Sequence, residues 1–161
     1  MVAITKKNKL KRAKLCLVCS PGGHFYQMQQ LNGWWSKYPH FWVTGATPDI
    51  RDKLRKEKVY YGYFPENRHA INAIRNLLLA ILVLRKERPS MIFTTGAGIS
   101  PPFFLIGKLL KIKLVFLETA SYVGIATLSG KLVYGFSDVF LIQHESSKKF
   151  YPKAKFKGGL I

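Results

Sequence analysis

Short runs of apolar residues alternate along the chain with longer segments that mix apolar and polar positions. The short runs are rich in β-branched and aromatic residues and are bounded by glycine, proline or charged residues, which is typical of buried strands. Six strands are predicted, at Lys14–Cys19, Phe41–Thr44, Val59–Phe64, Met91–Thr95, Leu114–Leu117 and Asp138–Ile142. Helices are predicted between them, over Phe25–Lys37, from Pro48 onwards, and over Ala70–Glu87, Pro101–Lys111 and Tyr122–Tyr134.

This alternation of strand and helix, with almost continuously apolar strands, predicts a parallel sheet that is covered by helices on both faces. We therefore expect an α/β fold of the Rossmann-like, doubly wound kind. The length of 161 residues predicts one domain, at 14–161, after a basic N-terminal segment at 1–13. Ligands of such sheets bind beyond the carboxyl ends of the strands, so the residues that follow each strand are the candidate site.

A glycine-rich turn follows the first predicted strand. Gly22 and Gly23 allow a ligand to approach the backbone closely, and the free N–H groups at the start of the next helix suit a phosphate or diphosphate. His24 would stand at the mouth of the cleft, where it could act as a base or as a diphosphate ligand. An ordinary turn before a helix is the alternative explanation for the two glycines.

A second loop of small residues follows the fourth strand, and Gly96, Gly98 and Ser100 are candidates for the same anion site. We expect Ser100 to cap the next helix, with Pro101 at its first position. Arg68, in the loop after the third strand, would face the same cleft and could bind phosphate, although arginine is also common on surfaces.

An acid, Glu118, directly follows the fifth strand, and Ser121 lies close behind it. A carboxylate at such a position is costly unless it is paired or solvated. Glu118 either caps the next helix or, together with Ser121, contacts a sugar acceptor or a partner chain. Cys16 and Cys19 lie within a predicted strand, so we expect buried thiols rather than a redox pair, and we expect no metal site.

The chain carries 26 Lys and Arg against 8 Asp and Glu, a net charge of +18, which requires an anionic partner or surface. The longest apolar run, Leu77–Leu84, is shorter than the roughly 18 residues that a membrane-spanning helix needs. The helix that contains this run has more apolar surface than one sheet can cover, so we expect a membrane or partner face there. The predicted face consists of Leu77, Leu78, Ile81, Leu82, Arg85 and Lys86.

Five segments in order resemble a known family. They are Ser20–His24, Thr94–Gly98, Leu117–Ser121, Leu128–Leu132, and Tyr151–Lys155 with Gly158–Leu160. The chain resembles the bacterial PssD-type polysaccharide biosynthesis proteins and their eukaryotic relative, the membrane-anchoring subunit of the dolichol-linked N-acetylglucosaminyltransferase. Both correspond to the N-terminal half of a GT-B glycosyltransferase such as MurG.

The resemblance implies a division of labour. In GT-B enzymes the N-terminal half binds the acceptor, so this chain would be the acceptor-binding, membrane-associating subunit of a two-component glycosyltransferase that is active only with its partner. It would bind a polyprenyl-diphosphate-linked glycan through Gly22, Gly23 and His24, as a peripheral protein on an anionic membrane surface, the cytoplasmic face of the plasma membrane. A PssE-type partner would bind the UDP-sugar donor, and this chain would bind no cofactor itself.

Two other function classes are weighed against this hypothesis. The charge also suits a nucleic-acid-binding domain, but no helix-turn-helix, zinc-finger or RNA-recognition signature is present. A stand-alone Rossmann enzyme with a nucleotide cofactor would require a G-x-G-x-x-G turn, which the loop at Ser20–His24 is not.

Overall fold

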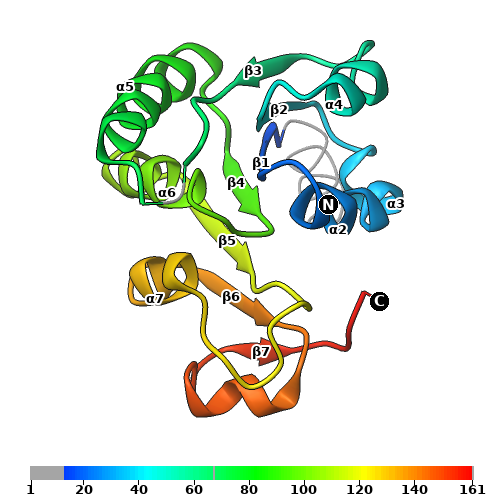
Figure 1. The fold of residues 1–161 in the computed structure, drawn as a ribbon, viewed down its shortest axis with the longest axis vertical. Coiled ribbons are helices and arrows are strands. Elements are labelled where there is room, and N and C mark those ends of the chain that lie inside the picture. The colour runs from blue at the N-terminus through cyan, green and yellow to red at the C-terminus, as the bar shows by residue number, and fades with distance from the viewer. Residues whose placement is uncertain (1–12, 67, 161) are drawn as a thin grey trace, which may run out of the picture.

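A seven-stranded parallel sheet forms the centre of the computed structural model, which describes residues 13–66 and 68–160 (Figure 1). The strand order is β3-β2-β1-β4-β5-β6-β7. The strands are β1 (Leu15–Val18), β2 (His40–Thr44), β3 (Val59–Tyr61), β4 (Met91–Thr94), β5 (Lys113–Leu117), β6 (Val139–Ile142) and β7 (Lys155–Phe156). The expected doubly wound α/β fold is therefore confirmed. The predicted basic segment at 1–13 lies, except for residue 13, outside the described residues.

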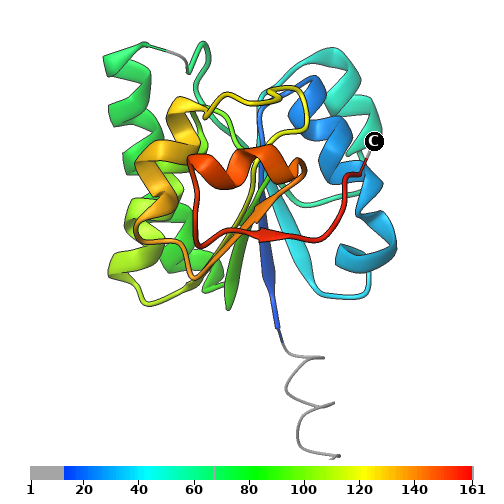
Figure 2. The ribbon, with the colours of Figure 1, turned by 90° about the horizontal axis from the view of Figure 1, so that it is seen from below.

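Helices cover both faces of this sheet (Figure 2). One layer contains α2 (Gly23–Gln30), α3 (Asn32–Trp35) and α4 (Pro48–Lys53). The other layer contains α5 (Ala70–Glu87), α6 (Ser100–Leu109) and α7 (Leu128–Tyr134). A 3₁₀ helix, η1 (Glu145–Lys149), connects β6 to β7.

Alternate residues of each strand point into opposite halves of the core, as the pleat of a strand requires. Cys16 and Val18 of β1 pack in the half beneath α5, α6 and α7, whereas Leu15 and Leu17 pack in the half beneath α2, α3 and α4. Cys16 and Cys19 are buried free thiols, as expected. Burial raises the pKa of Cys19 to about 12, so this thiol stays protonated at neutral pH.

Two helix predictions were partly wrong. The segment predicted as one helix from Phe25 divides into α2 and α3 at Leu31, whose φ of −91° and ψ of 11° interrupt the helix, and the Trp35 indole N–H donates to the Met28 carbonyl at 2.8 Å across this break. The helix predicted from Tyr122 begins only at Leu128, where the Thr127 hydroxyl accepts a hydrogen bond from the Gly130 N–H at 3.0 Å and caps it.

The predicted third strand ends at Tyr61 rather than Phe64. Two short elements, the 3₁₀ helix η1 and the strand β7, were not predicted. The strand β7 has two residues, and both are exposed. Such a strand carries no apolar pattern, so only its pairing with β6 reveals it.

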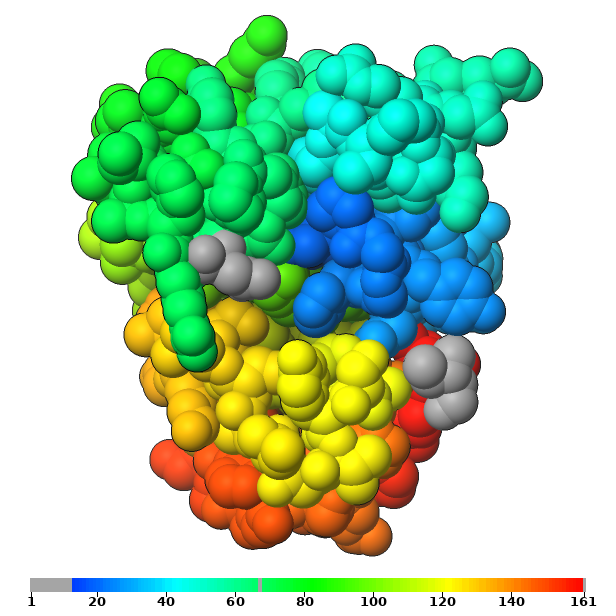
Figure 3. All heavy atoms as spheres, viewed as in Figure 1, coloured from blue at the N-terminus to red at the C-terminus, as the bar shows by residue number. Residues whose placement is uncertain are grey.

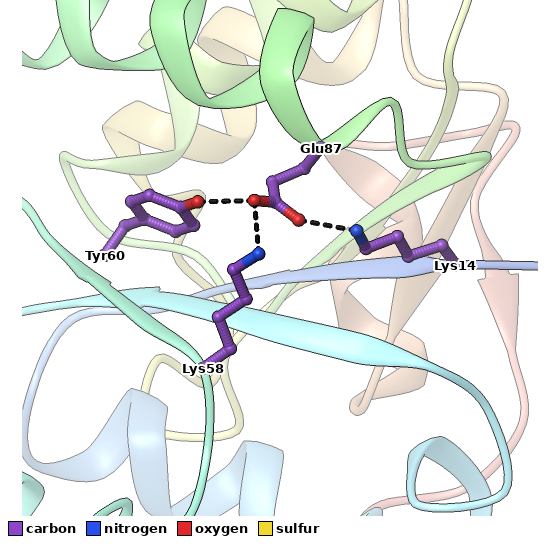
Figure 4. Close-up of polar contacts among 4 residues, drawn as sticks. All are labelled: Lys14, Lys58, Tyr60 and Glu87. Atoms are coloured by element: carbon purple, nitrogen blue, oxygen red, sulfur yellow. Dashed lines mark hydrogen bonds and ion pairs between the residues drawn. The ribbon is translucent and has the colours of Figure 1, made fainter.

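A buried carboxylate joins the amino-terminal ends of the sheet to the end of α5 (Figure 4). The Glu87 side chain is 2% exposed and forms ion pairs with Lys14 at 2.5 Å and Lys58 at 2.6 Å. The Tyr60 hydroxyl donates a further hydrogen bond to it. Burial alone would raise the pKa of Glu87, but the hydrogen bonds from Lys14, Lys58 and Tyr60 outweigh it and lower this pKa to about 2.

We expect Glu87→Gln to lower the free energy of unfolding by about 1–3 kcal/mol, because charge-assisted hydrogen bonds are lost in a buried site. The folded-state pKa of about 2 lies below the ordinary value of 4.5, so this stabilisation is complete above pH 4.5 and is lost as the pH falls towards 2. Denaturant unfolding of both proteins across this range measures the difference.

The control is Glu145→Gln, because Glu145 forms an exposed pair with Lys148. It should change stability by about 0.5 kcal/mol or less. A stability gap between the Glu87 variant and the parent that is the same at pH 2 and pH 7 would contradict the assignment.

Candidate functional site

A cleft of about 1230 Å³ lies over the carboxyl ends of the central strands. Figure 3 shows the surface hollowed between the start of α5 in green, the first helical turn after β1 in blue, and the loop before α7 in yellow. The side chains with polar groups that line the cleft are those of His24, Glu66, Arg68, His69, Tyr122, Thr127 and Ser129. The site expected at this edge of the sheet is therefore a real cavity.

Two hydrogen bonds join the first turn of α2 to the loop after β4 at the edge of this cleft. The His24 ring Nδ1 lies 2.7 Å from the Thr95 carbonyl oxygen, and the Thr95 hydroxyl donates to the His24 carbonyl at 2.8 Å. The strands β1 and β4 are neighbours, but the helices that follow them, α2 and α6, cover opposite faces of the sheet. This is the switch point at which doubly wound sheets bind ligands.

The first of these bonds determines which nitrogen of His24 carries the proton. A carbonyl oxygen can only accept, so Nδ1 is the N–H donor to Thr95. In the neutral ring, Nε2 therefore keeps its lone pair. Because His24 lines the cleft, this is the tautomer that a general base requires.

The loop after β4 forms a closed hydrogen-bonded turn beneath the His24 ring. The Ser100 hydroxyl donates to the Gly96 carbonyl at 2.7 Å, and the Gly96 N–H donates to the Thr94 hydroxyl at 3.0 Å. Gly96 has a φ of +107°, and a Cβ atom there would lie 3.2 Å from the His24 ring. Gly96 therefore serves close packing against His24.

The predicted anion ligands divide into three groups in the structure. Arg68 and Gly98 line the cleft together with His24. Gly22 and Gly23 are exposed at the start of α2, outside the cleft lining. The Ser100 side chain is buried, its hydroxyl is held by the loop, and it is the first residue of α6 rather than its cap, so the structure favours a structural role.

His69 also lines the cleft, and sequence reasoning missed it. Its Nδ1 accepts a hydrogen bond from the Asn72 N–H at 3.2 Å and caps α5. The neutral His69 ring therefore carries its proton on Nε2, the opposite tautomer to that of His24. The signal in the sequence was a polar residue directly before an apolar helix, where a cap is expected.

Glu118 is an internal anchor in this structure. It is 1% exposed, and it accepts hydrogen bonds from the Thr127 hydroxyl at 2.9 Å and from the Tyr151 hydroxyl at 2.7 Å. Burial raises the pKa of Tyr151 and the neighbouring carboxylate raises it further, so Tyr151 remains a donor. Because Thr127 caps α7, the structure favours the structural alternative for Glu118 over contact with an acceptor.

A buried amide network, which sequence reasoning also missed, lies beside Glu118. The Gln143 side chain donates to the Gln27 side-chain oxygen at 2.7 Å and to the Glu118 carbonyl at 2.9 Å, while Gln27 donates to the Thr119 hydroxyl at 2.9 Å. The amide network connects α2 to the end of β5 and the end of β6.

The predicted contact residue Ser121 is exposed, and its N–H donates a hydrogen bond to the Thr119 hydroxyl.

The outer surface of α5, α6 and α7 is apolar. Of the predicted face, Leu78 and Leu82 are exposed with Arg85 and Lys86, whereas Leu77 and Ile81 are half-buried and pack against the core. Further exposed leucines come from α6 and α7, at Leu105, Leu109, Leu128 and Leu132. Within residues 13–66 and 68–160, none of the helices combines the length and apolarity that crossing a bilayer requires.

Solved structures place the fold in a class. The chain is similar to Acinetobacter baumannii MurG, with a TM-score of 0.75 and 12% identity over 91% of this chain and 45% of that one. It is also similar to UDP-N-acetylglucosamine 2-epimerase from Rickettsia bellii, with a TM-score of 0.73 and 13% identity over 92% and 45%. The chain therefore has the Rossmann-like fold of one half of a GT-B protein and spans less than half of these two chains.

Sequence comparison gives the family. Residues 67–160 match the family model for "Oligosaccharide biosynthesis protein Alg14 like", and the chain belongs to this family. The "UDP-N-acetylglucosamine transferase subunit ALG14" of Candida albicans is 25% identical over 99% of this chain and 84% of its own length. The human protein of the same name is 22% identical over 91% and 82%. The expected resemblance is confirmed, and it favours the glycosyltransferase hypothesis over the other two.

The hydrogen bonds of the two cleft histidines predict a spectroscopic difference. At alkaline pH, ¹⁵N chemical shifts of the imidazole nitrogens should show the Nδ1–H tautomer for His24 and the Nε2–H tautomer for His69. Gly96→Ala should broaden or shift the His24 signals and leave those of His69 in place, because the Cβ atom added at residue 96 would press on the His24 ring. An Nε2–H tautomer at His24 would exclude the proposed orientation of its lone pair.

Proposed function

We propose that this chain is the acceptor-binding subunit of a two-component glycosyltransferase, which adds a sugar from a UDP-sugar to a polyprenyl-diphosphate-linked saccharide in surface polysaccharide biosynthesis. The observation that carries the proposal is the cleft at the switch point, which His24, Arg68 and Gly98 line and in which the hydrogen bond from Nδ1 to Thr95 leaves the His24 Nε2 unprotonated in the neutral ring. Family membership and the GT-B fold support it.

In this proposal the acceptor diphosphate lies at the polar end of the cleft. Arg68, which lines the cleft, supplies positive charge for its oxygens, and Gly22 and Gly23 at the exposed start of α2 would donate to the oxygens that reach beyond the cleft lining. His24 Nε2 takes the proton of the acceptor hydroxyl as that oxygen attacks the anomeric carbon of the sugar, and UDP leaves. The UDP-sugar is held by a separate, PssE-type chain.

The membrane-associating role rests on the apolar surface of α5, α6 and α7. Its exposed leucines are accompanied by exposed cations at Arg75, Lys108 and Lys131. An apolar surface with basic residues beside it suits the interface of an anionic bilayer, at the cytoplasmic face of the plasma membrane. The cleft would then open beside the surface from which a lipid-linked acceptor arrives.

The test of the function is a transfer assay with the chain alone and together with its donor-binding partner. We expect turnover only with both chains. In the complex, His24→Gln should lower kcat by about 10²–10⁴-fold, because a general base is lost. His40→Gln is the control, since His40 lies at the opposite end of the sheet, beside Glu57, and should leave kcat unchanged.

Full turnover by the isolated chain would contradict the two-component proposal. If the His24→Gln complex keeps its kcat and shows only a raised KM, His24 is not the general base and contributes only to acceptor binding.

Vesicle binding tests the membrane face. Replacing Leu78 and Leu82 together by serine should weaken binding to vesicles that contain phosphatidylglycerol by about tenfold or more, because each buried leucine contributes about 1.5–3 kcal/mol. Replacing Tyr26 and Phe156, which are exposed outside α5, α6 and α7, should change binding little. Equal losses for the two pairs would argue against a membrane face on α5.

A further inference from the structure

The cleft has two chemically different ends. Its mouth is polar and is lined by His24, Glu66, Arg68 and His69. Among residues 13–66 and 68–160, Glu66 is the acid in the lining, and its carboxylate accepts a hydrogen bond from the Ser20 hydroxyl while it keeps its negative charge. Arg68 can therefore pair with an anionic group of a ligand, which the proposed function supplies as a diphosphate.

Away from the mouth, the same cleft becomes an apolar groove along the helices. Its walls are Ile74 and Leu77 of α5 on one side and Leu132 of α7 on the other, and Leu105 of α6 lies between them. From Ala70 to Leu77 the groove follows α5 for about 10 Å, at 1.5 Å of rise per residue. Because the groove and the mouth are one cavity, its ligand should be an anionic head group joined to an apolar chain.

The position of the groove identifies the kind of chain. It runs towards the exposed leucines Leu78, Leu82 and Leu109, which belong to the proposed membrane face. A chain that leaves the groove would therefore pass directly into the bilayer. A partner helix could cover the leucines, but it would bring no anionic group for the mouth.

We propose that the groove between α5, α6 and α7 binds the first isoprene units of the polyprenyl chain, with the diphosphate at Arg68 and the attached sugar at His24. This inference rests on the proposed function, from which it takes the head group. Burial of the chain next to the diphosphate fixes the direction of the lipid, so the attached sugar lies at the His24 end of the cleft. Binding energy from a part of the substrate that does not react thus orients the part that does.

Titration calorimetry with the full chain tests the groove without membranes or detergent. The probes are inorganic pyrophosphate, dimethylallyl diphosphate and geranyl diphosphate, which share a head group and differ in chain length. We expect geranyl diphosphate to bind at least about tenfold more tightly than pyrophosphate, because burial of two methylene groups already supplies that factor.

Two leucines on one helix provide a matched pair of variants. Leu105 lines the groove and is 49% exposed, whereas Leu109, one turn later, lies outside the lining and is 71% exposed. Leu105→Ser should weaken geranyl diphosphate binding by about fivefold or more and leave pyrophosphate binding unchanged. Leu109→Ser should leave both unchanged. Ala73→Phe, which fills the groove without removing apolar surface, should act as Leu105→Ser does.

Three results would contradict the proposal that the groove binds the isoprene chain. If pyrophosphate binds but affinity does not rise with chain length, the groove fails and the diphosphate site of the proposed function stands. If Leu105→Ser and Leu109→Ser lose affinity equally, the chain adsorbs to the outer surface instead. If pyrophosphate itself does not bind, the diphosphate site fails together with the groove.

Discussion

The reciprocal hydrogen bonds between His24 and Thr95 are the interaction on which the rest of the site depends. They connect the first turn of α2, which follows β1, to the loop between β4 and α6, and these two helices lie on opposite faces of the sheet. A crevice at this position is inherent in a doubly wound sheet, and the two hydrogen bonds connect its two sides. They also select the tautomer of His24, so the fold and the chemistry of the cleft have a common cause. Gly96 is required because the ring packs on its backbone.

The opposite wall of the cleft depends on a buried carboxylate. Among residues 13–66 and 68–160, no lysine or arginine forms an ion pair with Glu118, so hydrogen bonds from Thr127 and Tyr151 offset the cost of its burial. Glu87, at the other end of the sheet, is paired with two lysines and lies far from the cleft. The two acids therefore have different roles: Glu87 contributes to stability, and Glu118 sets the position of the loop that begins α7.

The two helix layers differ in what they present to the surroundings. Among their large apolar side chains, α2, α3 and α4 expose Tyr26, whereas α5, α6 and α7 expose a series of leucines and isoleucines. An exposed apolar surface that extends over three neighbouring helices is uncommon on proteins that remain free in water. The cleft opens on the leucine-rich side, so one face of the molecule combines a polar mouth that contains Arg68, an apolar groove and an apolar surface. In the proposed function, this combination suits an amphiphilic acceptor.

The sequence by itself determined the order of strands and helices, because apolar runs and their periodicity depend on local burial alone. It also indicated the loops after β1 and β4, since glycines and helix starts are local signals. Only the tertiary structure decided that Ser100 and Glu118 are buried, that His69 lines the cleft, and that Leu77 faces the groove while Leu78 is exposed. These outcomes depend on contacts between residues far apart in the chain, such as Tyr151 with Glu118, and no local pattern specifies them.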